Sequence, residues 1–189
     1  MLGGTFDPIH AGHLVAAVNA RHALDLDRVL LVVANQPWQK ADRPVTPAED
    51  RLAVVEAAVA GHEGLEASRI EIDRGGESVT ADTLEQLRDG DPACELFLIV
   101  GADVAAALGT WRRMEAAARL ATLVVVNRPR VAPPEVGPPW RAVGVDIPCL
   151  EVSSSELRAR VAEGRPLDFL LPPAAITAIG RLGLYAEGT

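Results

Sequence analysis

The sequence is poor in cysteine, in aromatic residues and in positive charge. Of its 189 residues, two are cysteines, 4% are aromatic, and 18 lysines and arginines stand against 26 aspartates and glutamates. Cys94 and Cys149 match no metal or redox spacing, which indicates a reduced, cytoplasmic setting. The net charge of −8 argues against a general nucleic-acid binder, because such proteins usually present a basic face.

Long apolar runs are also missing. No segment approaches the ~20 apolar residues that a membrane span needs, and no basic stretch followed by an apolar one opens the chain as a secretory signal would. We therefore expect a cytoplasmic protein without a membrane partner. An anionic nucleotide would have to be held by local cations, helix termini and a metal ion, since the overall field is unfavourable.

Apolar segments of strand length alternate with helical segments along the chain. This alternation indicates βαβ units, and right-handed crossovers then place helices on both faces of a parallel sheet. The predicted fold is α/β, a doubly wound, Rossmann-like sheet in one domain over 1–189, with a helical C-terminal portion over 153–189. Strands are expected at 1–2, 28–34, 65–72, 94–100, 120–126 and 143–152, and the longer helices at 11–24, 47–60, 78–88, 153–163 and 172–183.

Polar motifs follow the predicted strands at the points where those strands end. Because ligands of open α/β sheets bind beyond the carboxyl ends of the strands, we expect these motifs to share one rim. They lie at 3–13, 35–40, 101–103, 127–128 and 153–158.

The first motif combines glycines, two histidines and the start of a helix. Glycines let backbone N–H groups approach a ligand, and a helix N-terminus favours anions, so the stretch predicts a polyphosphate site. His10 and His13 are three residues apart and can stabilise charge in phosphoryl chemistry. Two alternatives stay open: an ordinary helix start, or a pair of metal ligands, although a third ligand at useful spacing is missing.

The other motifs also have two readings. Ser153 with Glu156 forms a capping-box pattern that needs no ligand, yet Ser153, Ser154 and Arg158 can bind phosphate. Trp111 can be a core residue or a stacking platform for a flat ring. Segment 78–83 can cap a helix or offer donors to a small carboxylate.

Taken together, the motifs resemble a known family. Segment 3–13 reads GGTFDPIHAGH and is similar to the GGTFDPIHxGH signature of bacterial nicotinate-nucleotide adenylyltransferases, a branch of the HxGH nucleotidyltransferase superfamily. Four further motifs follow in the family's order, so the resemblance covers nearly the whole chain. They are NQPWQK at 35–40, SVTADTL at 78–84, GAD at 101–103 with Trp111, and VSSSELR at 152–158.

The resemblance implies a reaction and a set of site residues. ATP and nicotinate mononucleotide would give deamido-NAD and pyrophosphate, with Mg²⁺ carried by the substrate phosphates, no protein-borne metal site and no covalent intermediate. The match assigns catalysis to His10 and His13, ATP binding to Gly4, Thr5, His10, His13, Ser153, Ser154 and Arg158, and mononucleotide binding to Asn35, Lys40, Thr80, Thr83, Asp103 and Trp111.

Two departures from the family pattern stand out. Trp38 and Gln39 replace a common proline and histidine, a variant that resembles actinobacterial members. Only Met1 and Leu2 precede the first glycine, where the family has a longer apolar strand. We therefore expect the natural start to lie upstream of Met1, which an intact mass of the native protein would test.

Other functions stay open from the sequence. One is another HxGH transferase that acts on nicotinamide mononucleotide, phosphopantetheine or a cytidylyl acceptor. The other is a silent nucleotide sensor. The sequence also leaves open whether the protein forms a homo-oligomer.

Overall fold

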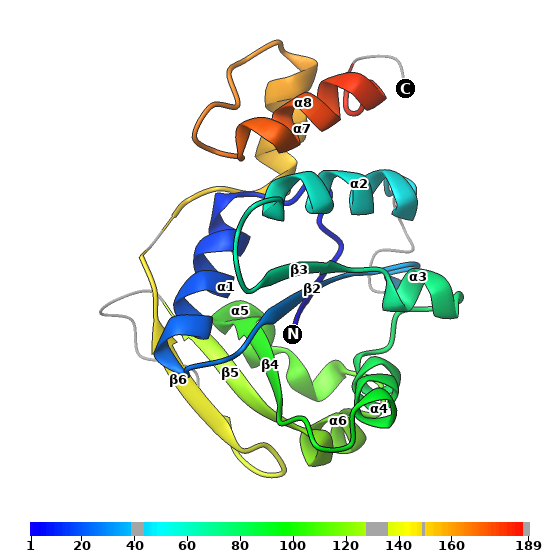
Figure 1. The fold of residues 1–189 in the computed structure, drawn as a ribbon, viewed down its shortest axis with the longest axis vertical. Coiled ribbons are helices and arrows are strands. Elements are labelled where there is room, and N and C mark those ends of the chain that lie inside the picture. Colours follow the sequence, from blue (N-terminus) through cyan, green and yellow to red (C-terminus); the bar gives the residue numbers. More distant parts are fainter. Residues whose placement is uncertain (39–43, 128–135, 149, 187–189) are drawn as a thin grey trace.

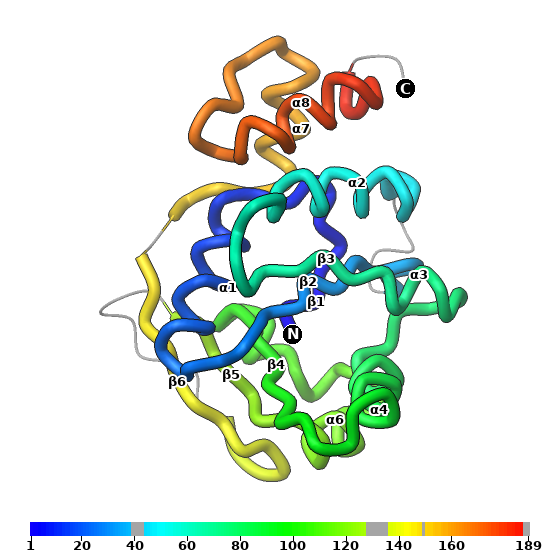
Figure 2. Tube along the Cα trace, in the orientation of Figure 1, coloured from blue at the N-terminus to red at the C-terminus, as the bar shows by residue number. Residues whose placement is uncertain are grey.

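Six parallel strands form one twisted sheet in the computed structural model of the chain, which describes residues 1–38, 44–127, 136–148 and 150–186 (Figures 1 and 2). The strands follow the order β3-β2-β1-β4-β5-β6, and every pairing is parallel. This arrangement confirms the doubly wound prediction. The strands are β1 Leu2–Gly4, β2 Val29–Val33, β3 Leu65–Ser68, β4 Leu96–Gly101, β5 Ala121–Asn127 and β6 Ala142–Asp146.

Helices cover both faces of the sheet (Figure 1). Consecutive residues of β5 alternate between two cores, with Val124 and Val126 beneath α1, α2 and α8, and Leu123 and Val125 beneath α4 and α6. The described helices are α1 Ala11–Ala23, α2 Ala48–Val59, α3 Ile70–Arg74, α4 Thr80–Gly90, α5 Ala102–Ala106, the 3₁₀ turn η2 Leu108–Thr110, α6 Met114–Leu120, α7 Ser154–Ala162 and α8 Pro173–Leu182. None of them is long and apolar enough to cross a membrane.

The central strand β1 extends through both glycines, whereas the sequence predicted a turn directly after Leu2. Leu2, Gly3 and Gly4 pair with β2, and Leu2 also pairs with Ile99 of β4. The Met1 amino group donates to the Phe97 carbonyl at 2.5 Å, and burial lowers its pKa to about 5. The chain order reverses between β1 and β4, which places the topological switch point at the end of the glycine strand.

The predicted strand at 65–72 is wrong in its second half. Strand β3 ends at Ser68, and the next residues form helix α3. The alternation of Ile70 and Ile72 with polar residues indicated a strand, but Glu71 is buried at 6% exposure. A tertiary contact of that carboxylate, described below, overrides the local pattern.

Two other predicted features also differ. Leu14, Val18 and His22 form one stripe of α1, but Val18 is 50% exposed, and alanines form the buried face of the helix. Small side chains let this helix lie close to the sheet. The sixth strand ends at Asp146 and not at 152, since Pro148 cannot donate a ladder hydrogen bond. The assignment of 1–189 to one domain stays a prediction.

Candidate active site

A cleft of about 920 Å³ opens at the carboxyl ends of β1, β4 and β5. Residues from all five polar motifs line it, as the prediction of a shared rim requires. The predicted site residues on its wall are Gly4, Thr5, His10, His13, Thr80, Asp103, Trp111, Ser153 and Ser154. Its size is within the range of small-molecule sites.

The loop between β1 and α1 turns back over the end of the glycine strand. Phe6 adopts a left-handed backbone with φ of 48° and lies in the core. A Cβ on Gly4 would lie 2.8 Å from the Phe6 ring, so this position requires glycine. The Phe6 ring in turn packs edge-on against His13, with 5.0 Å between ring centroids.

The two histidines of the motif stack on each other. Their ring centroids are 3.7 Å apart, and the His10 backbone N–H donates to Nδ1 of His13 at 3.2 Å. Because Nδ1 accepts, His13 in this arrangement is neutral and carries its proton on Nε2. A Cβ on Gly12 would lie 3.1 Å from Nδ1 of His10, so a larger residue there would crowd the His10 ring.

His10 differs from His13 in its surroundings. It is buried, and burial lowers its pKa to about 4, so it is uncharged at neutral pH. Its Nδ1 atom has no hydrogen-bond partner among the described residues. The sequence left the charge of both histidines open, and the structure makes His10 a neutral group.

Residues 153–158, called the serine turn here, contact the backbone of the loop between β1 and α1. Ser154 Oγ donates to the Pro8 carbonyl at 2.8 Å, and Arg158 Nη1 donates to the Asp7 carbonyl at 2.7 Å. Arg158 is not on the cleft wall. Ser153 caps α7 by accepting from the Glu156 N–H at 3.2 Å, while the Glu156 carboxylate pairs with an arginine one turn later. Only half of the predicted capping box therefore forms.

The C-terminal segment contacts the same loop from the other side. Tyr185 donates its hydroxyl to the buried Asp7 carboxylate at 2.8 Å. Burial, followed by the charge of Asp7, raises the pKa of Tyr185. The Ala11 N–H donates to the Leu170 carbonyl at 2.8 Å. Sequence reasoning missed Asp7 and Tyr185, which have no local signal for this contact because 178 positions separate them.

The loop after β2 is tied to the segment before α4. The Asn35 N–H donates to Ser78 Oγ at 2.8 Å, and its side-chain amide donates to the Gly76 carbonyl at 2.9 Å. Asn35 lines a smaller cavity of about 400 Å³ that shares Pro37 and Trp38 with the main cleft. Lys40, the other predicted residue of this loop, lies outside the described residues.

An arginine connects this loop to the turn that carries Trp111. The Arg112 guanidinium lies 4.7 Å from the centre of the Trp38 ring and forms an ion pair with Glu77. Trp38 and Trp111 are both on the wall of the main cleft. The sequence predicted Trp111 as a stacking platform or a core residue, and the structure places it on the cleft with partial burial.

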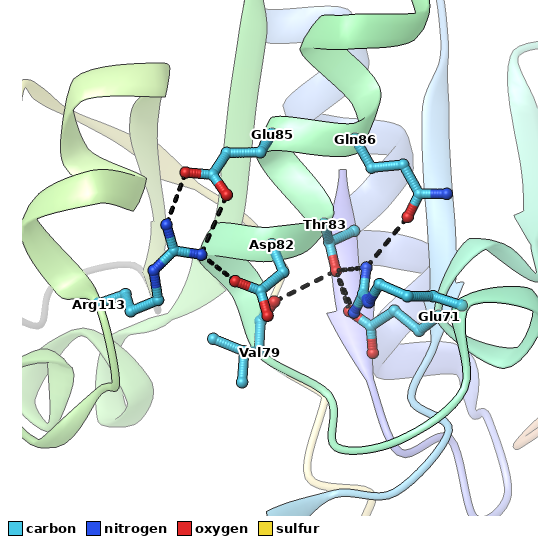
Figure 3. Close-up of polar contacts among 8 residues, drawn as sticks. Glu71, Val79, Asp82, Thr83, Glu85, Gln86 and Arg113 are labelled. Carbon is cyan, nitrogen blue, oxygen red and sulfur yellow. Dashed lines mark hydrogen bonds and ion pairs between the residues drawn. The ribbon is translucent and has the colours of Figure 1, made fainter.

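Thr83 is not on the cleft wall, although the sequence placed it on the mononucleotide side. It is fully buried, and its hydroxyl donates to Glu71 Oε1 at 2.6 Å and accepts from Arg74 at 3.1 Å (Figure 3). Glu71 does line the cleft. On the exposed side of α4, Asp82 and Glu85 pair with Arg113 (Figure 3). Thr83 therefore holds Glu71, a residue of the cleft wall, in place without lining the cleft itself.

Replacing Thr83 with valine should lower the free energy of unfolding by about 1–3 kcal/mol, because the buried Glu71 carboxylate loses its donor while the side-chain shape is kept. Urea denaturation followed by circular dichroism measures this. Thr177→Val, at an exposed position of α8, is the matched control and should cost much less. Equal losses in the two variants would contradict a supporting role for Thr83.

Comparisons with known proteins agree with this geometry. Residues 1–160 match a model of the Cytidylyltransferase-like family. A probable nicotinate-nucleotide adenylyltransferase of Corynebacterium kroppenstedtii is 45% identical over 98% of this chain and 89% of its own length. The protein with the same description from Streptomyces coelicolor is 44% identical over 97% of this chain and 98% of its own length.

A solved structure shares the fold. Nicotinic acid mononucleotide adenylyltransferase of Plasmodium falciparum, complexed with NaAD, superposes with a TM-score of 0.75 at 18% identity, over 97% of this chain and 95% of that one. The same protein complexed with APC gives the same TM-score. With a family match over most of its length and relatives of 44–45% identity across nearly all of it, the chain belongs to the nicotinate-nucleotide adenylyltransferase family.

Proposed function

We propose that the protein transfers the adenylyl group of ATP to nicotinate mononucleotide, giving deamido-NAD and pyrophosphate in NAD biosynthesis. The observation that carries this proposal is the single cleft at the switch point, which residues from all five polar motifs line. The glycine–histidine loop (residues 3–13), the serine turn, Thr80 and Trp111 all line this cleft, and the proposal assigns the first two to ATP and the other two to the mononucleotide. The names of the relatives, and the NaAD and APC complexes of the Plasmodium protein, support the same assignment.

The ATP side would use the glycine–histidine loop. Gly4, Thr5 and the N-terminus of α1 approach the triphosphate, since the backbone and the helix dipole favour an anion there. His13 donates from Nε2 to the transferred phosphoryl group, and neutral His10 orients His13 by stacking and by its backbone N–H. Ser153 contacts the phosphates directly, while Ser154 and Arg158 hold the loop through the Pro8 and Asp7 carbonyls.

The mononucleotide side would use residues of three other segments. Thr80 and Trp111 contact the pyridine end, and Asp103 lies between the two substrates at the end of β4. Asn35 shapes this side through its contacts with Ser78 and Gly76, and Thr83 acts through Glu71. Lys40, on the same loop as Asn35, stays a prediction from the sequence.

Mg²⁺ fits this site as an ion that arrives with the triphosphate. Within the described part of the chain, no three His, Cys, Asp or Glu side chains lie together as a metal site, and Asp103 offers one carboxylate on the cleft wall. When bound, Mg²⁺ neutralises charge on the phosphate oxygens. The residues of the chain position the mononucleotide 5′-phosphate for in-line attack on the α-phosphorus, and pyrophosphate leaves without a covalent enzyme intermediate.

A pyrophosphate-release assay with ATP and a panel of acceptors tests the proposal. We expect kcat/KM for nicotinate mononucleotide to exceed that for nicotinamide mononucleotide by at least ~10-fold, because donors placed for a carboxylate are left unpaired by an amide. Phosphopantetheine, and a cytidylyl acceptor with CTP, should give no turnover. Equal rates with the two mononucleotides would refute the specificity, and ATP binding without turnover on any acceptor would indicate a sensor.

A further inference from the structure

The largest fully buried side chain among the described residues is a charged one. Arg51 of α2 is 1% exposed. Its Nε donates to the Thr46 carbonyl at 2.7 Å, Nη1 to the Thr5 carbonyl at 2.6 Å, and Nη2 to the Asn35 carbonyl at 3.2 Å. One guanidinium thus joins three chain segments that are far apart in sequence.

The partners of this guanidinium are unusual for a buried cation. Within the described ranges they are backbone carbonyls, and no carboxylate forms an ion pair with it. Burial lowers the pKa of Arg51, whereas the nearby Asp7 carboxylate opposes this shift. An arginine that served only to neutralise a buried acid would pair with a carboxylate. The bonds to three carbonyls indicate that the rigid, planar guanidinium instead connects backbone segments.

Two of the three carbonyls belong to loops with predicted substrate residues: Thr5 is on the wall of the main cleft, and Asn35 lines the smaller cavity beside it. Thr5 follows the glycine strand and lines the cleft on the ATP side. Asn35 starts the loop on the mononucleotide side and fixes the segment before α4 through Ser78 and Gly76.

The ladder between β1 and β2 ends at the bond from the Ala34 N–H to the Gly4 carbonyl. The rigid, planar guanidinium bonds the next residue of each segment, Thr5 and Asn35, and so holds the two loops together just beyond the sheet.

We propose that Arg51 is a positioning residue that holds the ATP loop and the mononucleotide loop at the separation required for in-line attack. This inference rests on the proposed function, since it assigns one substrate to each loop. Arg51 is not on the wall of the main cleft and would act through the backbone of Thr5 and Asn35. Displacement of reacting groups by about 1 Å can cost on the order of 10²-fold in rate, so kcat is the parameter that should respond.

Arg51→Ala should lower kcat at saturating substrates by at least ~10-fold, with smaller changes in the two KM values. The smaller cavity, which Arg51 and Asn35 line, gives added guanidinium a route to the vacated carbonyls. We therefore expect millimolar guanidinium chloride, far below denaturing concentrations, to restore much of the lost kcat. Loss of packing alone would not respond to guanidinium.

Val55→Ala is the matched control, because Val55 is fully buried on the same helix and contacts neither loop through a hydrogen bond. It should lower the melting temperature while kcat stays within twofold, and guanidinium should not raise it. Arg51→Lys keeps the positive charge but loses the planar guanidinium. If Arg51→Ala does not fold, the kcat of Arg51→Lys tests the inference instead.

The inference is overturned if the folded Arg51 variant keeps kcat within twofold of the parent, if Val55→Ala loses as much kcat, or if guanidinium fails to restore Arg51→Ala. These outcomes all require an active parent enzyme. A parent without turnover on any acceptor refutes the proposed function instead, so the two failures are distinguishable.

Discussion

Replacing His13 with alanine is expected to lower kcat for adenylyl transfer by about 10²–10³-fold while the affinity for ATP changes little. The reason is the tautomer that the structure favours. Nδ1 of His13 accepts from the His10 backbone, so the proton is on Nε2, a donor for charge that grows on the transferred phosphoryl group. Pyrophosphate release gives kcat, and calorimetric titration with ATP gives the affinity.

Two further variants separate this donor from the packing of the ring. His13 contacts both Phe6 and His10, so alanine also removes aromatic contacts. His13→Phe keeps a ring there without a donor and should lose as much kcat as alanine. His62→Ala, at an exposed turn, should leave kcat unchanged. If His13→Ala keeps the kcat of the parent, His13 has no part in the mechanism.

Much of the fold could be predicted because buried parallel strands are encoded locally. The run that became β2 is continuously apolar, the run that became β5 is apolar except for Thr122 until its last residue, and polar residues stand at the carboxyl end of each. That order alone implied a parallel sheet and a shared rim. The glycine–histidine loop could also be predicted, since its residues carry both the turn and the phosphate chemistry.

The missed features depend on partners that are distant in sequence. The buried Glu71 accepts a hydrogen bond from Thr83, 12 positions away, and it lies in a helix where the alternation indicated a strand. Arg158 meets the Asp7 carbonyl across 151 positions. Every residue has a backbone carbonyl, so the residue type does not show which carbonyl accepts a side-chain hydrogen bond. Neither this contact nor those of Arg51 could therefore be inferred before the fold was known.

The free energy of unfolding should decrease as the pH is lowered, because of His10. Its pKa is about 4 in the folded protein, below the ordinary 6.5, since burial disfavours the imidazolium. As pH falls, the unfolded chain therefore binds the proton first. The contribution of neutral His10 to stability is fully present above pH 6.5 and is lost as pH falls toward 4. Over that whole window the loss is roughly 3 kcal/mol.

Urea denaturation of the parent and of His10→Gln at pH 7, 6 and 5 measures this contribution. Glutamine does not titrate, so the free energy of unfolding of the parent should fall by about 2 kcal/mol more between pH 7 and 5 than that of the variant. Other titrating groups, the Met1 amino group among them, contribute equally to both proteins and cancel in the comparison. His62→Gln, at an exposed histidine, should follow the parent. Parallel pH curves for the parent and His10→Gln would mean that His10 is not held neutral by its surroundings.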